Sequence, residues 1–153
     1  MKLNSLRALS VDQWRWAFSA YFRLWLVQLC IKFGSSSWLM TKIELAGCKD
    51  QILTNNTESQ ISKELDRAVE MFESIRLAAR CQFWDTDCLP RSIVLADMLN
   101  GSTAVTAIVI LGVSKQEHGL SLASHAWVEL NGQIVAEPEE VTTNFSRVKT
   151  EVP

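Results

Sequence analysis

The chain has 153 residues, 48% of them hydrophobic and 21% charged, so it is long enough for one domain with a buried core and has no long disordered composition. Fifteen Lys and Arg against 17 Asp and Glu give a formal charge of −2, which argues against a nucleic-acid-binding protein with its usual basic stripe. The four cysteines form no CxxC pair, and the chain shows no cleavable signal pattern. We therefore expect free thiols, a cytoplasmic protein, and neither a metal site nor a cofactor.

Residues 14–33 are the most apolar part of the chain and predict a helix. Arg23 and Gln28 interrupt the segment, and no charge-free run approaches the roughly 18 residues that a membrane span needs. Arg15, Ser19 and Arg23 form a polar stripe on this helix. Beside it lies an apolar face, which we expect to pack on the domain or on a partner protein, or else to contact a membrane surface. It consists of Trp14, Phe18, Phe22, Trp25 and Leu29.

Gly34 and three serines end this helix, and a short helix over 38–46 and a polar linker over 49–57 follow. A strong helix is predicted over 58–80 as core scaffold. Its apolar face consists of Ile61, Leu65, Val69, Phe72, Ile75 and Ala79.

The last third of the chain changes to the two-residue period of strands. Residues 104–113 are apolar and β-branched, and residues 124–130 alternate. Asn131-Gly132 is a strong hairpin turn before a return strand over 133–137. The tail from Pro138 is expected to fray. Helices followed by an antiparallel sheet predict an α+β fold.

Cys88 begins a predicted helix, because Pro90 belongs in a first turn, where its missing N–H has no partner to lose. Asp85 and Asp87 are expected to be turn and helix-start residues. A cysteine at this position lies at the positive end of the helix dipole, which favours a negatively charged, nucleophilic sulfur. The alternative is a small buried apolar residue, the commoner fate of cysteine.

His125 lies on the strand before the hairpin and is the candidate base for Cys88. A triad also needs an acid that orients the imidazole, and the return strand carries Glu137. A two-residue turn pairs Leu130 with Gln133 and leaves Glu137 on the opposite face from His125. A three-residue loop with Gly132 as a bulge pairs His125 with Glu137 and matches apolar residues on the other face. We predict the bulged register, with Glu137 as orienter ahead of Glu129.

Three pieces of sequence together resemble the stand-alone leader peptidases of lasso peptide biosynthesis, the protease half of the split B protein in the transglutaminase-like superfamily. These pieces are Cys-Leu-Pro-Arg-Ser-Ile-Val-Leu from Cys88, the strand with Leu111-Gly112-Val113, and His-Ala-Trp-Val-Glu-Leu-Asn-Gly from His125. The resemblance covers roughly residues 85–137, and more weakly the apolar N-terminal helices.

The resemblance implies a papain/transglutaminase-like fold in which residues 51–153 form the catalytic core and residues 1–50 a helical region packed on that core or on a partner. We expect one compact domain overall. It implies a cysteine endopeptidase with Cys88 as nucleophile and His125 as base, acting on a lasso precursor peptide. The family often has Asp as third triad member, where this chain has Glu137, and it often carries basic residues where this chain has residues 100–103. A separate leader-binding protein is implied as partner, with an ATP-dependent cyclase acting on the product.

Gln82 lies six residues before Cys88, the spacing at which papain-like enzymes carry a glutamine that donates to the oxyanion. An exposed polar residue is the alternative for Gln82. Two other functions remain open for the chain. One is another amide hydrolysis or acyl transfer on the same fold, and the other is a non-catalytic peptide-docking module with an inert Cys88.

Overall fold

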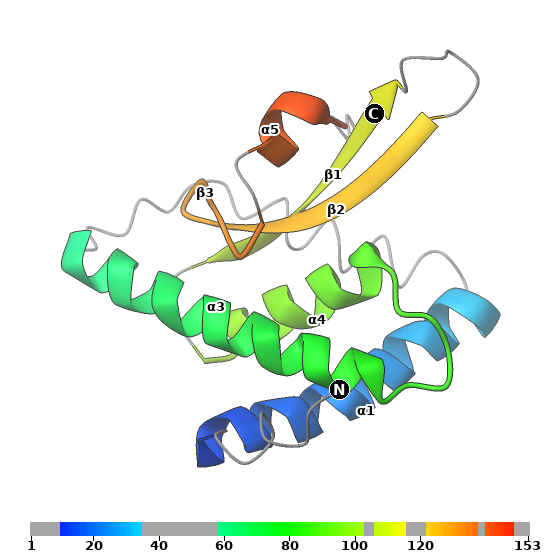
Figure 1. Ribbon diagram of the computed structural model, residues 1–153, viewed down its shortest axis with the longest axis vertical. Coiled ribbons are helices and arrows are strands. Elements are labelled where there is room, and N and C mark those ends of the chain that lie inside the picture. The colour runs from blue at the N-terminus through cyan, green and yellow to red at the C-terminus, as the bar shows by residue number, and fades with distance from the viewer. Residues whose placement is uncertain (1–9, 35–57, 103–105, 116–121, 138–139, 149–153) are drawn as a thin grey trace.

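The structure is a computed structural model that describes residues 10–34, 58–102, 106–115, 122–137 and 140–148. Helices α1 (Val11–Phe33), α3 (Glu58–Arg80) and α4 (Cys88–Asn100) lie on one side of a curled antiparallel sheet, and the short helix α5 (Glu140–Asn144) lies on the other (Figure 1). The predicted α+β class is confirmed. The short helix expected over 38–46 and the linker over 49–57 lie outside the described residues.

The sheet contains β1 (Ala107–Lys115), β2 (Leu122–Leu130), β3 (Gln133–Ile134) and β4 (Ser146–Arg147) in the order β3-β2-β1-β4. Every pairing is antiparallel. Because β3 pairs only with Glu129 and Leu130, most of β2 is a free edge as far as the structure describes the chain. Helix α4 contacts both β2 and β1.

Residues 140–144 and 146–147 of the tail form regular structure, so the prediction that the tail frays was wrong for this part of it. Residues 140–144 form α5, and β4 pairs with Gly112 and Val113 of β1. The tail is polar and its strand has only two residues, so the local sequence carries no pattern for it. Its order comes from pairing with β1, a contact between distant parts of the chain.

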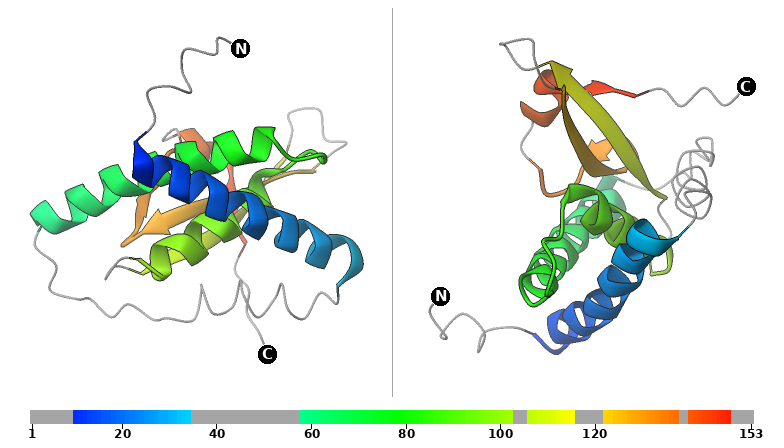
Figure 2. Two further views of the ribbon diagram at one scale, coloured as in Figure 1. Left: turned by 90° about the horizontal axis from the view of Figure 1, so that it is seen from below. Right: turned by 90° about the vertical axis from the view of Figure 1, so that its right-hand side faces the viewer.

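Helix α1 packs across α3 and α4 (Figure 2) with the face opposite to the one expected. Its buried residues are the small or medium-sized Ala17, Ala20, Leu24 and Val27. The predicted aromatic face is turned outward, with the side chain of Phe18 69% exposed. Small side chains let helix backbones approach closely, so the domain core selects the alanine face and leaves the bulky one outside.

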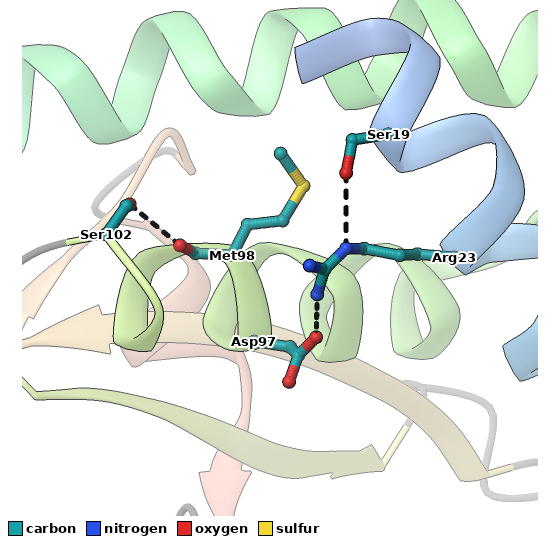
Figure 3. Close-up of polar contacts among 5 residues, drawn as sticks. All are labelled: Ser19, Arg23, Asp97, Met98 and Ser102. Carbon is teal, nitrogen blue, oxygen red and sulfur yellow. Dashed lines mark hydrogen bonds and ion pairs between the residues drawn. The ribbon is translucent and has the colours of Figure 1, made fainter. Parts of the chain in front are cut away.

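Helix α1 begins three residues earlier than expected. The Ser10 hydroxyl accepts from the Gln13 backbone N–H and the Gln13 side chain accepts from the Ser10 N–H, a reciprocal cap that starts the helix at Val11. Farther along, Arg23 donates to the Ser19 hydroxyl (3.3 Å) and pairs with Asp97 of α4 (Figure 3). The predicted polar stripe therefore borders the contact between α1 and α4.

The predicted bounds of the helix over 58–80 are confirmed. Its buried face is rotated from the expected one, because Ala68, Met71, Ile75 and Ala78 are buried while Val69 is 39% exposed. Apolar residues on this helix cover more than one stripe, and the neighbouring α1 and α4 decide which stripe is buried. Within the described ranges, no helix combines the length and the apolarity of a transmembrane span.

Candidate active site

Helix α4 begins at Cys88, as predicted, and places its thiol at the helix N-terminus. Asp87 occupies the N-cap position with extended backbone (φ −68°, ψ 179°), and its side chain makes no capping hydrogen bond. The backbone N–H groups of Cys88 and Leu89 have no acceptor inside the helix, and the Asp87 carboxylate accepts from neither of them. The Cys88 thiol is free and partly buried. An uncapped helix start thus offers a nucleophilic atom and adjacent N–H donors at one place.

The segment before Cys88 is held against α1. The Gln82 side-chain amide donates to the Tyr21 carbonyl (2.9 Å), and the Gln28 amide donates to the Asp85 carbonyl (3.1 Å). The Lys32 ammonium lies 5.4 Å from the centre of the Trp84 ring. These contacts position the connection from α3 to α4. Gln82 therefore contacts α1 through one of its amide hydrogens, and the oxyanion role stays a prediction.

A buried hydrogen bond ties α4 to β2. The Ser92 hydroxyl donates to the Ala126 carbonyl at 2.9 Å. Ser92 follows Cys88 by four residues, so both lie on one face of α4. Ala126 directly follows His125 on β2. The bond thereby holds the cysteine-bearing face of α4 against the strand segment that carries the histidine.

The His125 imidazole is packed between aromatic rings. It stacks on Trp127 with ring centres 6.2 Å apart and an angle of 19°, and the Phe145 ring lies at 5.4 Å. Gly112 pairs with His125 on the neighbouring strand. A Cβ atom at Gly112 would come within 2.6 Å of the Trp127 ring and 2.8 Å of the Phe145 Cβ atom. The glycine makes the room that these two rings need beside His125.

Glu137 approaches the Nε2 nitrogen of His125. The Nε2 and Oε1 atoms are 3.6 Å apart, and the two side chains are 23% and 22% exposed. This distance is compatible with an ion pair when the imidazole is protonated, and it is longer than a direct hydrogen bond. Hydrogen bonds of this kind often shorten only when substrate binds. The structure brings these two predicted residues together.

The hairpin register differs from the prediction. Leu130 pairs with Gln133 across Asn131 and Gly132, whose φ values of 51° and 82° define a two-residue turn. The bulged three-residue loop was therefore wrong, because Asn-Gly supplies the two positive φ angles that the tighter turn requires. The Val135 N–H still donates to the Val128 carbonyl (3.0 Å), so regular pairing continues one residue beyond β3.

Ala136 explains how Glu137 reaches His125 in this register. Continued regular pairing places His125 opposite Pro138 and turns Glu137 to the other face. Ala136 instead has a left-handed backbone with φ 57°. One residue in this conformation breaks the alternation of side chains, and Glu137 returns to the face of His125. Glu137 therefore lies near His125 as predicted, but the left-handed backbone of Ala136 brings it there and not the predicted bulge at Gly132.

Glu129, the second choice as orienter, has other partners. It is buried (1% exposed), and its Oε1 atom accepts from the Trp127 indole N–H (3.0 Å) and from Arg147 (2.6 Å). Arg147 comes from β4, so the pair joins β2 to the tail strand across β1. A buried carboxylate with two donors is a stable arrangement. Glu129 fixes the indole that stacks on His125.

Several residues of this site were not identified from the sequence. Phe145 and Arg147 lie in the tail that was expected to fray, so no local signal pointed to them. Ser92 had a signal, because it stands four residues after Cys88 on a helix whose first residue was already a candidate. Among the described residues, no three His, Cys, Asp or Glu side chains gather in a way that holds a metal ion.

A family model described as the transglutaminase-like superfamily matches residues 24–150. Searches of curated proteins and of solved structures found no match. The matched region runs from the middle of α1 to beyond β4 and includes Cys88, His125 and Glu137. The superfamily contains cysteine peptidases and acyltransferases and is typically catalytic. The fold, the free cysteine at a helix start and the family match agree, and the chain belongs to the transglutaminase-like superfamily.

Proposed function

We propose that the chain is a cysteine peptidase in which Cys88 is the nucleophile, His125 the base and Glu137 the residue that orients His125. The observation that carries the proposal is the 3.6 Å approach of Glu137 to the Nε2 atom of His125. With Nε2 facing a carboxylate, the Nδ1 atom is the nitrogen left to exchange a proton with the thiol. The Ser92–Ala126 bond supports this pairing, because it holds the two elements together.

In the proposed reaction, His125 takes the thiol proton and the Cys88 sulfur attacks the scissile carbonyl carbon. The N–H of Cys88 donates to the oxyanion, and the second amide hydrogen of Gln82 is the further donor. His125 then gives its proton to the leaving amine as the C–N bond breaks, which leaves an acyl-enzyme. Water, deprotonated by His125, releases the acid product and restores the thiol.

The proposed substrate is the precursor of a lasso peptide, cut between its leader and its core. The support is the resemblance of the segments around Cys88, Gly112 and His125 to leader peptidases of that pathway. A separate leader-binding protein presents the precursor, and an ATP-dependent cyclase uses the freed core. Acyl transfer to an amine is the second candidate, because the superfamily contains acyltransferases and the same acyl-enzyme serves both reactions.

The outward face of α1 is the proposed contact for the leader-binding protein. It exposes a row of large apolar side chains, and exposed apolar patches of this kind mark interaction sites. Contact with a membrane surface is the alternative use of the same face. The row consists of Val11, Trp14, Phe18, Phe22, Trp25, Leu26 and Phe33.

The test mixes the purified chain with a lasso precursor and leader-binding protein from the same gene cluster, and follows the products by mass spectrometry. We expect a cut at the leader–core junction, with the summed mass of the two products exceeding that of the precursor by one water molecule. Cys88→Ala should abolish the cut, since the sulfur is the attacking atom. Glu137→Gln should slow the cut by about tenfold or more. Cys30→Ser is the matched control, because Cys30 is a partly buried free cysteine inside α1 and not at a helix start.

The outcomes separate the candidates. Adding a small primary amine gives an amide product if the chain is an acyltransferase, whereas a peptidase gives the free acid. An intact precursor in the presence of a folded chain and bound partner supports the docking module. Iodoacetamide labelling then decides whether Cys88 is inert, and it needs a Cys81→Ser background because Cys81 is exposed.

A further inference from the structure

A pocket of about 300 Å³ lies beside the start of α4. Its walls come from the end of α3, from the connection between α3 and α4, and from the first turns of α4. The lining residues are Arg76, Ala79, Arg80, Gln82, Trp84, Asp85, Thr86 and Arg91. Thr86 and Arg91 stand two residues before and three residues after Cys88, so the pocket borders the proposed nucleophile in the chain.

The pocket is positively charged in a chain whose formal net charge is −2. Three of its lining residues are arginines, and Asp85 is the one acid among them. Arg76 is partly neutralised, because it donates to Glu73 at 2.8 Å. Arg80 and Arg91 form no ion pair with any acidic side chain in the described part of the chain, and Asp85 forms none with them. Two guanidinium groups are therefore available to an incoming anion.

Arg91 and the walls of the pocket are held in place by hydrogen bonds and a ring contact. The Arg91 Nε–H donates to the Asp87 carbonyl at 3.0 Å, which keeps the guanidinium at the helix start and leaves its terminal N–H groups free for a ligand. Gln82 is fixed to Tyr21, and the Trp84 ring lies against Lys32. A pocket with anchored donors binds an anion with less loss of side-chain freedom than mobile surface arginines do.

We propose that this pocket binds a carboxylate side chain of the substrate, held between Arg80 and Arg91. Guanidinium groups pair with carboxylates through parallel N–H···O bonds, and these charge-assisted bonds are the strong ones. The Cβ atoms of Cys88 and Arg91 are about 5–6 Å apart, as for any residues three apart on a helix. An extended peptide advances about 3.3 Å per residue, so the acidic residue lies within about three positions of the scissile bond. The inference rests on the proposed peptidase function and names a substrate preference for it.

The test uses internally quenched peptides that span the leader–core junction of the lasso precursor. Each carries Glu, or Gln in the matched peptide, at one of three positions on either side of the cut. We expect kcat/KM for Glu to exceed that for Gln by about tenfold at one of these positions. Arg80→Ala should bring the ratio to within about twofold of one, and Arg80→Glu should favour a Lys peptide at that position instead.

Arg15→Ala is the matched control, because Arg15 is an exposed arginine on α1 that lines a different pocket. It should keep the preference for Glu. A reversed preference in Arg80→Glu excludes misfolding as the cause of the changed ratio, since a misfolded protein loses activity without gaining a preference for Lys. Equal cleavage of Glu and Gln peptides at all six positions overturns the pocket and leaves the peptidase function standing.

A binding measurement separates the two proposals. The Cys88→Ala chain is titrated with the same peptides, labelled for fluorescence anisotropy. Tighter binding of the Glu peptide than of the Gln peptide, lost when Arg80→Ala is added to Cys88→Ala, supports the pocket. This holds even if the native chain cleaves no peptide and the peptidase proposal has failed. Equal binding of both peptides together with absent cleavage overturns both proposals.

Discussion

Ala136 is the residue on which the geometry of His125 and Glu137 depends. Its positive φ of 57° turns Glu137 toward the imidazole in a register that otherwise turns it away. An L-residue with a side chain in this conformation costs about 1–2 kcal/mol. The neighbouring Val135 is buried, and Ala136 itself packs against the core, so burial offsets this cost. Strain of this kind is often found beside functional groups.

Substitutions at Ala136 test this dependence. Ala136→Val should lower both the melting temperature and kcat/KM, because a β-branched residue disfavours the left-handed conformation and turns Glu137 away. Ala136→Gly should retain cleavage within about threefold, since glycine adopts positive φ without strain. Thermal unfolding by circular dichroism and the peptide assay measure the two effects. Cleavage by the valine variant at the native rate would show that Ala136 does not aim Glu137.

Helix α1 has two apolar faces with different roles. The face of alanines with Leu24 and Val27 packs on α3 and α4, and the aromatic face is exposed. Hydrophobicity alone does not distinguish them, because both faces consist of apolar residues. The size of the side chains does, since the inner face must fit between two helices.

Matched substitutions on the two faces should differ in stability. Leu24→Ala should lower the free energy of unfolding by about 2–5 kcal/mol, because it leaves a cavity in the core. Phe18→Ser should change it by no more than about 0.5 kcal/mol, because the side chain is already in solvent. Urea denaturation of the two variants measures both values. A large loss for Phe18→Ser would mean that this face is covered in the free protein.

At the scale of the whole molecule, α1 is part of the same packed domain as the candidate site. Ala20, Leu24 and Val27 share one hydrophobic core with residues of α3, α4 and the sheet. Tyr21 and Gln28 hold the segment that leads into Cys88. The family match begins within α1, at residue 24. The helix therefore supports the position of the nucleophile as well as the core.

Removal of residues 1–50 should prevent the remainder from folding. The shortened chain exposes the core surface of α3 and α4 that α1 covers, and it frees the segment before Cys88. We expect a loss of cooperative thermal unfolding and of peptide cleavage. Circular dichroism and the cleavage assay measure these. Cooperative unfolding of residues 51–153 alone would show that the catalytic core folds without the N-terminal helical region.

The sequence by itself determined the class of the fold and the positions of its main elements. The helix over 58–80, the helix start at Cys88, the strand with His125 and the Asn-Gly turn follow from periodicity and local backbone preference, and the structure has all of them. Such features depend on contacts between residues near in sequence. The candidate residues Cys88, His125 and Glu137 came from the same local patterns together with the family resemblance.

Only the tertiary structure decided which faces are buried and how the site is assembled. The inner face of α1, the stripe of α3, the turn of Glu137 at Ala136 and the order of the tail beside β1 all differ from what the sequence predicted. In each case several local arrangements are close in free energy, and contacts with distant elements select one. The partners of Glu129 and His125 come from the tail for the same reason. Local preference decides where an element begins, and packing against distant residues decides which way its side chains point.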